Sequence, residues 1–223
     1  MMRNFKLSIL SATLCLQSIQ AFSSTPSTKV FHFGAGCFWA PADKLRDVPG
    51  IISTSVGYCG DDTPFKSTPK YESVCAGRTK LVEAVRVEYD ENQLQYEELL
   101  NLFANVNTAE FGNKRQYAGI IFTASDEEAE TASNFLAENK QVVAYVEEMS
   151  DTFYKAEKYH QNYWFKWRVR VPALIATLAA VGEFGGDSRQ TIYNAICYAF
   201  IAFTLLERKV GADVETIVMN DKA

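Results

Sequence analysis

The 223-residue chain has only two histidines, His32 and His160, and none of its five cysteines lies in a C-x-x-C pair. Because zinc centres use closely spaced cysteine and histidine ligands, we expect no metal site. Long basic runs are also missing, and the formal net charge is -5. Proteins that bind nucleic acid usually carry a basic patch, so we expect a small molecule or another protein as the partner.

The N-terminal region has no apolar run that could cross a bilayer, which takes roughly 20 residues. Its apolar stretch, Leu7–Leu16, follows the basic start Met1–Lys6 and precedes a polar stretch that contains Ala21. These three zones are typical of a cleaved signal peptide. We therefore predict that residues 1–28 are a targeting presequence that leads into the secretory pathway. The Ala21-Phe22 junction, followed by a Ser/Thr-rich segment, resembles a bipartite presequence and would indicate a plastid destination.

The stretch Val30–Trp39 contains the first candidate for chemistry. An apolar run ends in Gly34-Ala35-Gly36, and a helical pattern begins after Cys37, which predicts a strand that leads into a helix through a glycine turn. Free N–H groups and the positive dipole end at a helix N-terminus favour a thiolate. We therefore expect a reactive thiol at Cys37; the alternative is a cysteine that only packs in the core.

A second candidate is Glu83, at the start of a segment that alternates in period two up to Tyr89. Val85, Val87 and Tyr89 define the inward face, and Glu83 is in phase with them. Loss of solvation raises the pKa of a carboxyl group, so Glu83 could donate a proton near neutral pH. The alternative is a strand-end glutamate that turns out to solvent.

The remaining patterns alternate between strands and helices. Ser125, with Glu128 three residues later, predicts a helix N-cap. The order indicates an α+β fold, a two-layer sandwich of a mixed sheet with helices packed on it. The other predicted elements are a helix over Phe38–Asp47, a strand over Ile51–Val56, a long loop over Gly57–Lys70, a helix over Leu94–Val106, a strand over Tyr117–Thr123, a helix from Ser125 to about Asn139 and a strand over Val142–Val146.

Residues 166–223 are predicted to form a helical C-terminal extension. Val171–Lys209 indicates two apolar helices with a break at Gly185-Gly186. The apolar part of the second helix, Ile192–Leu206, is short for a membrane span, so we expect packing on the domain or on a partner; membrane attachment is the less favoured alternative. Cys197 lies in this helix and is predicted to be buried.

From Val30 to Trp164 the chain resembles the type A peptide-methionine sulfoxide reductases, a family with the same two-layer fold. The ordered set of motifs is more specific than any one of them. The matching motifs are Gly36-Cys37-Phe38-Trp39, Val56-Gly57-Tyr58, Tyr71-Glu72-Ser73-Val74-Cys75-Ala76-Gly77, Glu83-Ala84-Val85-Arg86-Val87 and Phe153-Tyr154-Lys155-Ala156-Glu157-Lys158-Tyr159-His160-Gln161. The resemblance sets a catalytic domain over residues 29–165.

The resemblance implies thiol-dependent reduction of methionine-S-sulfoxide, free or in proteins. Cys37 would attack the sulfoxide sulfur and become a sulfenic acid, and Glu83 would protonate the departing oxygen. Tyr71 and Tyr117 would hydrogen-bond to that oxygen. The aromatic walls of a pocket for the S-methyl group would be Phe38 and Trp39.

The resemblance implies no bound cofactor. It implies an external thiol reductant, either thioredoxin-like or glutathione-linked. Cys59, beside the predicted loop, is the expected internal fallback thiol, whereas a buried Cys197 would react slowly. The alternative function is a non-catalytic paralogue that keeps the fold and pocket as a binding module. A Cys–His hydrolase is a third option, and it would need a histidine base near Cys37. His32 is out of phase with Phe31 and Phe33, so we expect it at the surface or in packing rather than as this base.

The chain also departs from the family pattern. The loop before Tyr117 is shorter by about two residues and lacks an acid that helps to bind the substrate. Because the expected nucleophile, acid and hydroxyl groups remain, we expect altered substrate binding rather than lost chemistry. The other departures are Ala40, Ala42, Leu81 and Asn107-Thr108-Ala109.

Overall fold

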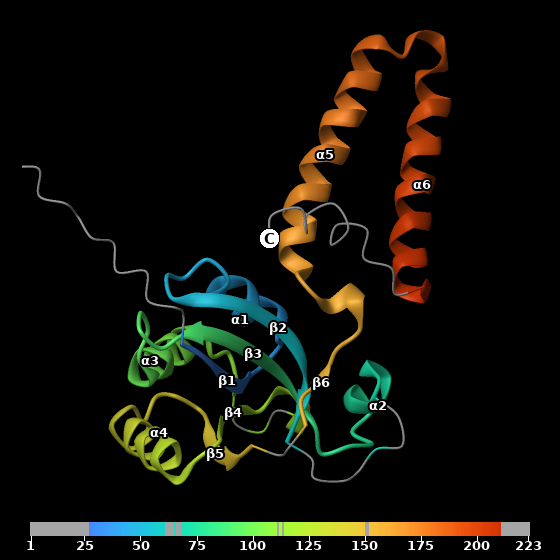
Figure 1. Cartoon of the computed structure of the whole chain (residues 1–223). Coiled ribbons are helices and arrows are strands. Elements are labelled where there is room, and N and C mark those ends of the chain that lie inside the picture. Colours follow the sequence, from blue (N-terminus) through green and yellow to red (C-terminus); the bar gives the residue numbers. More distant parts are fainter. Residues whose placement is uncertain are drawn as a thin grey trace, which may run out of the picture.

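The computed structural model describes residues 27–60, 65, 68–110, 112, 114–149 and 152–210 of the chain. Its core is a mixed sheet with strand order β5-β4-β1-β3-β2-β6, in which β4 and β5 are parallel and the other neighbours antiparallel (Figure 1). The predicted α+β fold with helices against a mixed sheet is thereby confirmed. The strands are β1 (Thr28–Ala35), β2 (Ile51–Cys59), β3 (Val82–Asp90), β4 (Gly119–Thr123), β5 (Tyr145–Glu148) and β6 (Tyr154–Lys155).

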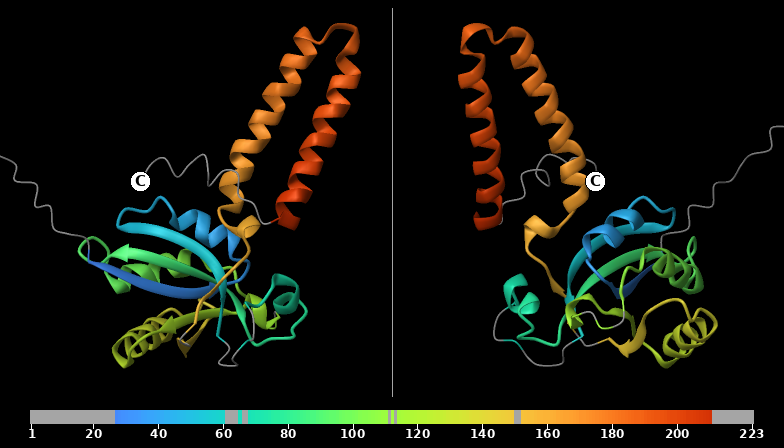
Figure 2. Two further views of the ribbon diagram at one scale, coloured as in Figure 1. Left: turned by 45° about the vertical axis from the view of Figure 1, so that its right-hand side comes forward. Right: turned by 180° about the vertical axis from the view of Figure 1, so that it is seen from behind.

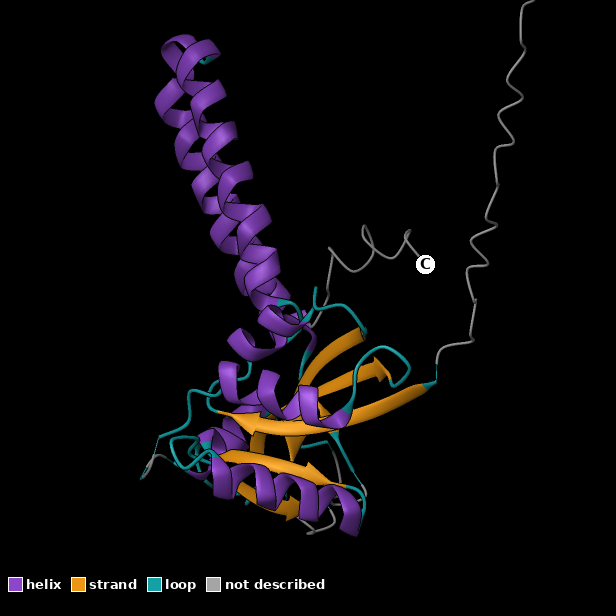
Figure 3. Ribbon diagram, turned by 90° about the vertical axis from the view of Figure 1, so that its left-hand side faces the viewer, coloured by secondary structure: helices purple, strands orange, loops and turns teal. Residues whose placement is uncertain are grey.

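The helices lie around this sheet and beyond it (Figure 3). The α-helices are α1 (Trp39–Leu45), α2 (Tyr71–Cys75), α3 (Tyr96–Val106), α4 (Asp126–Glu138), α5 (Tyr163–Phe184) and α6 (Arg189–Val210). The shorter 3-10 turns are η1 (Arg115–Tyr117), η2 (Lys158–His160) and η3 (Gly186–Ser188).

One side of the sheet carries the larger apolar cluster. Phe33 of β1 meets Phe103 of α3 edge to face, with ring centroids 5.4 Å apart. The helical spacing of Leu99, Leu100 and Phe103 buries all three side chains in this cluster. A smaller cluster contains Cys59, Val82, Ala84, Ile120 and Phe122. Successive strand residues alternate between the sheet faces, so Tyr58 and Cys59 point in opposite directions.

Strand β2 corrects one prediction. It continues through Gly57-Tyr58-Cys59, which the sequence placed in a loop, because its end pairs with the start of β3, Tyr58 with Glu83 and Cys59 with Val82. Cys59 is fully buried, and burial raises the pKa of its thiol. The expectation of an accessible Cys59 is therefore wrong.

Several other boundaries also differ. The strand predicted from Tyr117 starts at Gly119, after η1, and the last predicted strand lies at Tyr145–Glu148. The structure adds α2 and β6, for which no element was predicted. Strand β6 is only two residues long, and α2 is a single turn, so neither has a periodic pattern to detect.

Gly36 makes the turn from β1 toward α1. Its φ of +82° lies in the left-handed region, which side chains disfavour. A Cβ atom there would also lie 2.5 Å from Oγ1 of Thr108. The hydroxyl of Thr108 donates to the carbonyl of Ala35 at 2.9 Å, so this residue, one of the departures from the family pattern, supports the turn before Cys37.

Helices α5 and α6 form an antiparallel hairpin that extends away from the sheet (Figures 1 and 2). The predicted break between two helices is confirmed, at η3. Much of the hairpin faces outward, with Ile175 61% and Tyr198 71% exposed. Cys197 is exposed as well, so its predicted burial is wrong; nothing in the described chain covers that side of α6. No helix of the described residues is long and apolar enough to cross a membrane.

Candidate active site

Cys37 lies between the end of β1 and the start of α1, and its side chain is exposed. The surrounding protein still removes water from its sulfur, and this desolvation raises the pKa of the thiol above its ordinary value of 9.0. A hydrogen bond with the backbone of Trp39 acts in the opposite direction but is the smaller effect. The backbone at the start of α1 thus favours the thiolate, as predicted, but desolvation outweighs this effect and the net pKa of the thiol is raised.

Glu83 is the second residue of β3, and it is only 1% exposed. The predicted inward direction is confirmed. Burial raises the pKa of its carboxyl group to about 7, against a smaller opposing effect of the backbone N–H of Phe38. Phe38 directly follows Cys37 in sequence, and its N–H donates to Oε2 of Glu83 at 3.2 Å. Oε1 is buried without a hydrogen-bond partner in the described chain, so the acidic proton belongs on Oε1.

Two tyrosines complete this group. Tyr71 is the first residue of α2, and Tyr117 is the last residue of η1. The pKa values of both hydroxyls are raised, chiefly by burial and also by the nearby Glu83, so both stay protonated and can donate. A hydrogen bond with Tyr71 partly opposes the shift at Tyr117. The structure thus brings Cys37, Glu83, Tyr71 and Tyr117 into one electrostatically coupled site.

Cys75 joins this site, although the sequence gave it no role. It is half-buried at the end of α2, and its electrostatic interaction with Cys37, Tyr71 and Tyr117 raises the pKa of each of these three groups. The side-chain amide of Gln116 donates to its sulfur at 3.3 Å. No disulfide joins the four described cysteines.

The two predicted aromatic walls have different surroundings. Phe38 is 1% exposed and packs in the large apolar cluster. Trp39 is half-buried at the surface, and its ring stacks on Tyr163 of α5 at 3.8 Å with an interplanar angle of 7°. Its indole N–H donates to Nδ1 of His160 at 3.1 Å.

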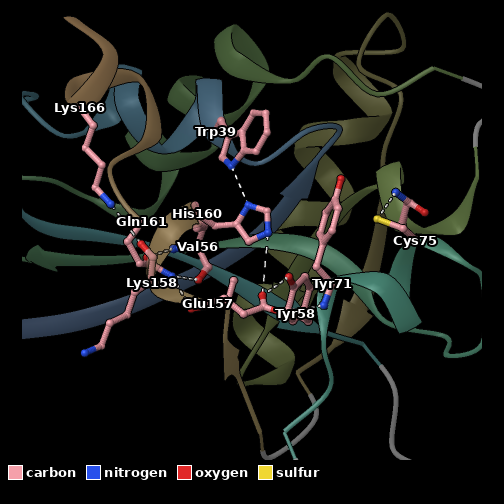
Figure 4. A network of polar contacts seen from close by, with 12 residues as sticks. Trp39, Val56, Tyr58, Tyr71, Cys75, Glu157, Lys158, His160, Gln161 and Lys166 are labelled. Atoms are coloured by element: carbon pink, nitrogen blue, oxygen red, sulfur yellow. Dashed lines mark hydrogen bonds and ion pairs between the residues drawn. The ribbon is translucent and has the colours of Figure 1, made fainter. Parts of the chain in front are cut away.

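His160 is the residue that the sequence analysis missed (Figure 4). It is 2% exposed and lies among the rings of Phe38, Trp39, Tyr71 and Tyr159, with centroids 4.1 to 5.6 Å away. Burial lowers its pKa to about 4, so it is neutral and carries its proton on Nε2.

Glu157 fixes the start of α2 in the same network (Figure 4). Its carboxylate accepts from the backbone N–H of Tyr71 at 2.9 Å and from the hydroxyl of Tyr58 at 2.9 Å. Gln161 binds both backbone groups of Val56, with its Oε1 accepting at 3.0 Å and its Nε2 donating at 2.9 Å. The motif Glu157–Gln161 therefore ties the sheet edge to the site, and the resemblance was the only sequence signal for it.

Among the residues that the structure describes, neither histidine is placed for a hydrolytic dyad with Cys37, and no metal centre is formed. His32 stands beside Phe153, with ring centroids 5.3 Å apart, and burial lowers its pKa to about 4. Nδ1 of His160 is occupied by Trp39. Within the described ranges, no three His, Cys, Asp or Glu side chains could hold a metal ion.

Residues 29–180 match the sequence profile of the family described as peptide methionine sulfoxide reductase. This range covers more than half of the chain, so the chain belongs to that family. The predicted activity, thiol-dependent reduction of methionine sulfoxide, is confirmed at this level.

Curated relatives and solved structures agree. The chain is 39% identical over 144 residues to the peptide methionine sulfoxide reductase MsrA of Nautilia profundicola, covering 60% of this chain and 81% of the relative. It is 34% identical over 151 residues to the MsrA of Methanococcus maripaludis, covering 63% of this chain and 94% of the relative. The solved structure of methionine sulfoxide reductase A of Corynebacterium diphtheriae aligns with a TM-score of 0.54 at 29% identity, covering 63% and 76%. Reduced Mxr1 of Saccharomyces cerevisiae aligns with a TM-score of 0.53 at 27% identity, covering 62% and 85%.

Proposed function

We propose that Cys37 is the nucleophile and Glu83 the general acid of this methionine sulfoxide reductase. The observation that carries this assignment is the buried carboxyl group of Glu83, with a pKa of about 7, bound to the backbone beside the exposed thiol. A sulfoxide oxygen leaves easily only when it is protonated, so a thiol next to a protonated carboxyl group suits this reaction.

The step balances as a transfer of oxygen between two sulfur atoms. The Cys37 thiolate attacks the sulfoxide sulfur and forms a sulfur–sulfur bond, while Glu83 gives its proton to the oxygen, so that the sulfur–oxygen bond breaks and the oxygen leaves as hydroxide. The hydroxide then attacks the Cys37 sulfur, the sulfur–sulfur bond breaks, methionine leaves as the thioether, and Cys37 is left as a sulfenic acid. The substrate sulfur gains the two electrons that the Cys37 sulfur loses. Tyr71 and Tyr117 donate hydrogen bonds to the oxygen as its charge develops.

The reactive form holds a single proton on the Cys37–Glu83 pair. Because the thiol pKa is raised and the carboxyl pKa is about 7, most singly protonated molecules hold this proton on sulfur. Transfer of the proton to Glu83 forms the thiolate and the general acid in the same event. Two such coupled groups titrate as a pair.

We also propose that an external dithiol of the thioredoxin type restores Cys37. Cys59 points to the opposite face of the sheet from Tyr58 and its partner Glu83, and it is fully buried, so it is not a fallback. Cys37 itself is exposed, which lets an external thiol reach it. The first thiol forms a mixed disulfide with release of water, and the second thiol of the same donor then displaces Cys37.

A single-turnover experiment tests these assignments. One equivalent of N-acetyl-methionine-S-sulfoxide is added to the reduced full chain without a reductant, dimedone then traps sulfenic acid, and mass spectrometry identifies the labelled cysteine. We expect the label on Cys37. A label elsewhere would contradict the assignment of the nucleophile. A dominant Cys37–Cys75 disulfide would show that Cys75, and not an external thiol, reacts first with the sulfenic acid.

The presequence is a separate proposal. The basic, apolar and Ser/Thr-rich zones support targeting by residues 1–28, and the family match begins at residue 29. A fluorescent protein fused after residue 28 should enter the secretory pathway, with a plastid as the proposed end point. Diffuse cytosolic fluorescence would refute this proposal.

A further inference from the structure

A cavity of about 290 Å³ lies between the catalytic domain and the helical hairpin, beside the active site. It is lined on the side of the domain by Trp39, Tyr71, Tyr159 and His160, so it shares two of the predicted site residues, Trp39 and Tyr71. The hairpin closes the other side with side chains of α5 and α6. They include Trp167, Arg170, Thr204, Leu205, Glu207 and Arg208.

Aromatic rings run from the site along the hairpin. Trp39 stacks on Tyr163, and Tyr163 lies 6.2 Å from Trp167 between ring centroids. Trp167 in turn meets Phe200 of α6 edge to face at 6.1 Å. Such rings offer large apolar contact areas, and half-buried rings at a cavity can accept a further ring.

The hairpin wall is fixed to the domain by several polar contacts. Arg168 of α5 binds both carboxylate oxygens of Asp43 of α1, at 2.6 and 2.8 Å. The guanidinium group of Arg46 donates to Oδ1 of Asn162 at 3.1 Å. Nζ of Lys166 donates to the carbonyl of Lys158 at 3.2 Å. The wall is therefore preformed, as expected of a ligand site.

Three of the four charged residues of the cavity are joined through Glu207, and the fourth, Arg208, lies over the ring of Tyr159 at 5.7 Å from its centroid. Arg170 donates to both carboxylate oxygens of Glu207, at 2.8 and 2.9 Å, and Nζ of Lys166 is 3.3 Å from Oε1 of the same group. These contacts join α5 to α6. They also leave the aromatic and aliphatic side chains as the surfaces that can meet a ligand by burial of apolar area.

The size of the cavity restricts its occupant. Ligand pockets usually measure about 300–1,000 Å³, so this one suits a single bulky side chain better than a cofactor. Trp39 and Tyr71 line this cavity and are also the residues predicted to contact the sulfoxide, so an occupant of the cavity can belong to the same peptide as the sulfoxide. A side chain next to oxidised methionine in a peptide meets both conditions.

We propose that this cavity is a specificity subsite for the residue next to methionine sulfoxide in a peptide or protein, and that it selects a large apolar side chain, above all an aromatic one. The proposal rests on the proposed function of the neighbouring site. It assigns Trp167 and Leu205 as specificity-determining residues. It also gives the hairpin a substrate-binding role in a chain that lacks the acid the family carries in the loop before Tyr117.

The test compares three substrates with the full chain and a thiol reductant. The substrates are N-acetyl-methionine-S-sulfoxide and two short peptides that carry the sulfoxide between either two tryptophans or two alanines. We expect kcat/KM to be about 10- to 100-fold higher for the tryptophan peptide than for the alanine peptide, the range in which apolar contacts discriminate. Equal values for both peptides would overturn the proposal.

Variants then locate the preference. Trp167→Ala and Leu205→Ala should reduce the ratio of kcat/KM between the tryptophan and alanine peptides toward one. They should not change the turnover of N-acetyl-methionine-S-sulfoxide. Ile201→Ala, at another exposed position of α6, is the matched control and should keep the ratio. Thr204→Phe should fill the cavity and exclude the tryptophan peptide, which tests the site even if Trp167→Ala fails to fold. A ratio unaffected by both Leu205→Ala and Thr204→Phe would overturn the proposal, whereas absence of turnover with every substrate would instead refute the proposed function.

Discussion

Replacement of Glu83 by glutamine separates proton donation from the shape of the side chain. The carboxyl pKa of about 7, against an ordinary value of 4.5, corresponds to about 3 kcal/mol of destabilisation of the ionised form by burial. Glutamine has no charge to bury, and its carbonyl oxygen can still accept from the backbone N–H of Phe38. It cannot deliver an acidic proton to the departing oxygen, so we expect kcat/KM to fall about 10²- to 10⁴-fold.

The pH dependence provides a sharper test than the rate alone. In the unmodified chain, kcat/KM should fall as the pH drops below about 7, because the Cys37–Glu83 pair then takes up a second proton. It should fall again above the raised pKa of Cys37, where the pair has lost both protons. In Glu83→Gln the limb near pH 7 should disappear, and the remaining activity should rise with pH as the thiolate forms.

Stability measurements give an independent check on the same residue. A raised carboxyl pKa means that the folded chain binds more protons than the unfolded chain between pH 4.5 and about 7, so stability decreases as the pH rises through this window. Relative to Glu83→Gln, the unmodified chain should lose about 3 kcal/mol of unfolding free energy across it, as measured by urea titration. Glu88→Gln, on the same strand, is the matched control for activity. An unchanged rate and pH profile in Glu83→Gln would refute our assignment of the general acid.

Other expected results concern the nucleophile, the buried histidine and the base of the hairpin. Cys37→Ser should abolish sulfoxide reduction, because a hydroxyl group is a weaker nucleophile and cannot be oxidised in this way; turnover near the original rate would contradict its role. Because the pKa of His160 is lowered to about 4, the chain should be most stable above pH 6.5 and should lose about 2 kcal/mol of unfolding free energy by pH 5. Urea titrations should show this loss in the unmodified chain and not in His160→Gln. Glu207→Ala removes the carboxylate shared by Lys166 and Arg170 and should lower the unfolding free energy by about 3–5 kcal/mol, with Glu183→Ala on the hairpin as control; an unchanged thermal midpoint would show that these contacts contribute little.

The parts of the fold that could be predicted are those with a local pattern. Period-two alternation located β3, helical spacing located α3, and the serine cap located α4, whose Ser125 hydroxyl accepts from the N–H of Glu128 at 3.2 Å. The end of β2 has a glycine and precedes a polar segment, so its pattern resembles a loop. Its strand structure depends on pairing with β3, more than 20 residues away in sequence.

The same distinction applies to the site. Cys37 and Glu83 lie next to periodic segments, so their positions could be inferred. The thiol pKa could not be inferred, because it depends on burial in the folded chain and on the electrostatic effects of Glu83 and Cys75, which are remote in sequence. His160 lies more than 120 residues after Trp39, and no spacing rule joins an indole to an imidazole across that distance. Cys197 was assigned to a core by its apolar neighbours, although the hairpin has more apolar surface than the domain covers.

The stack of Trp39 on Tyr163 has an optical consequence. Two rings held 3.8 Å apart and nearly parallel share their electronic transitions and, in a fixed chiral setting, contribute to circular dichroism in the near ultraviolet. One ring belongs to α1, close to Cys37 in sequence, and the other is the first residue of α5. Near-ultraviolet signals vanish when specific packing is lost even if helices persist. This band therefore reports whether the hairpin is docked on the site, without a label, and Tyr163→Leu supplies the blank spectrum.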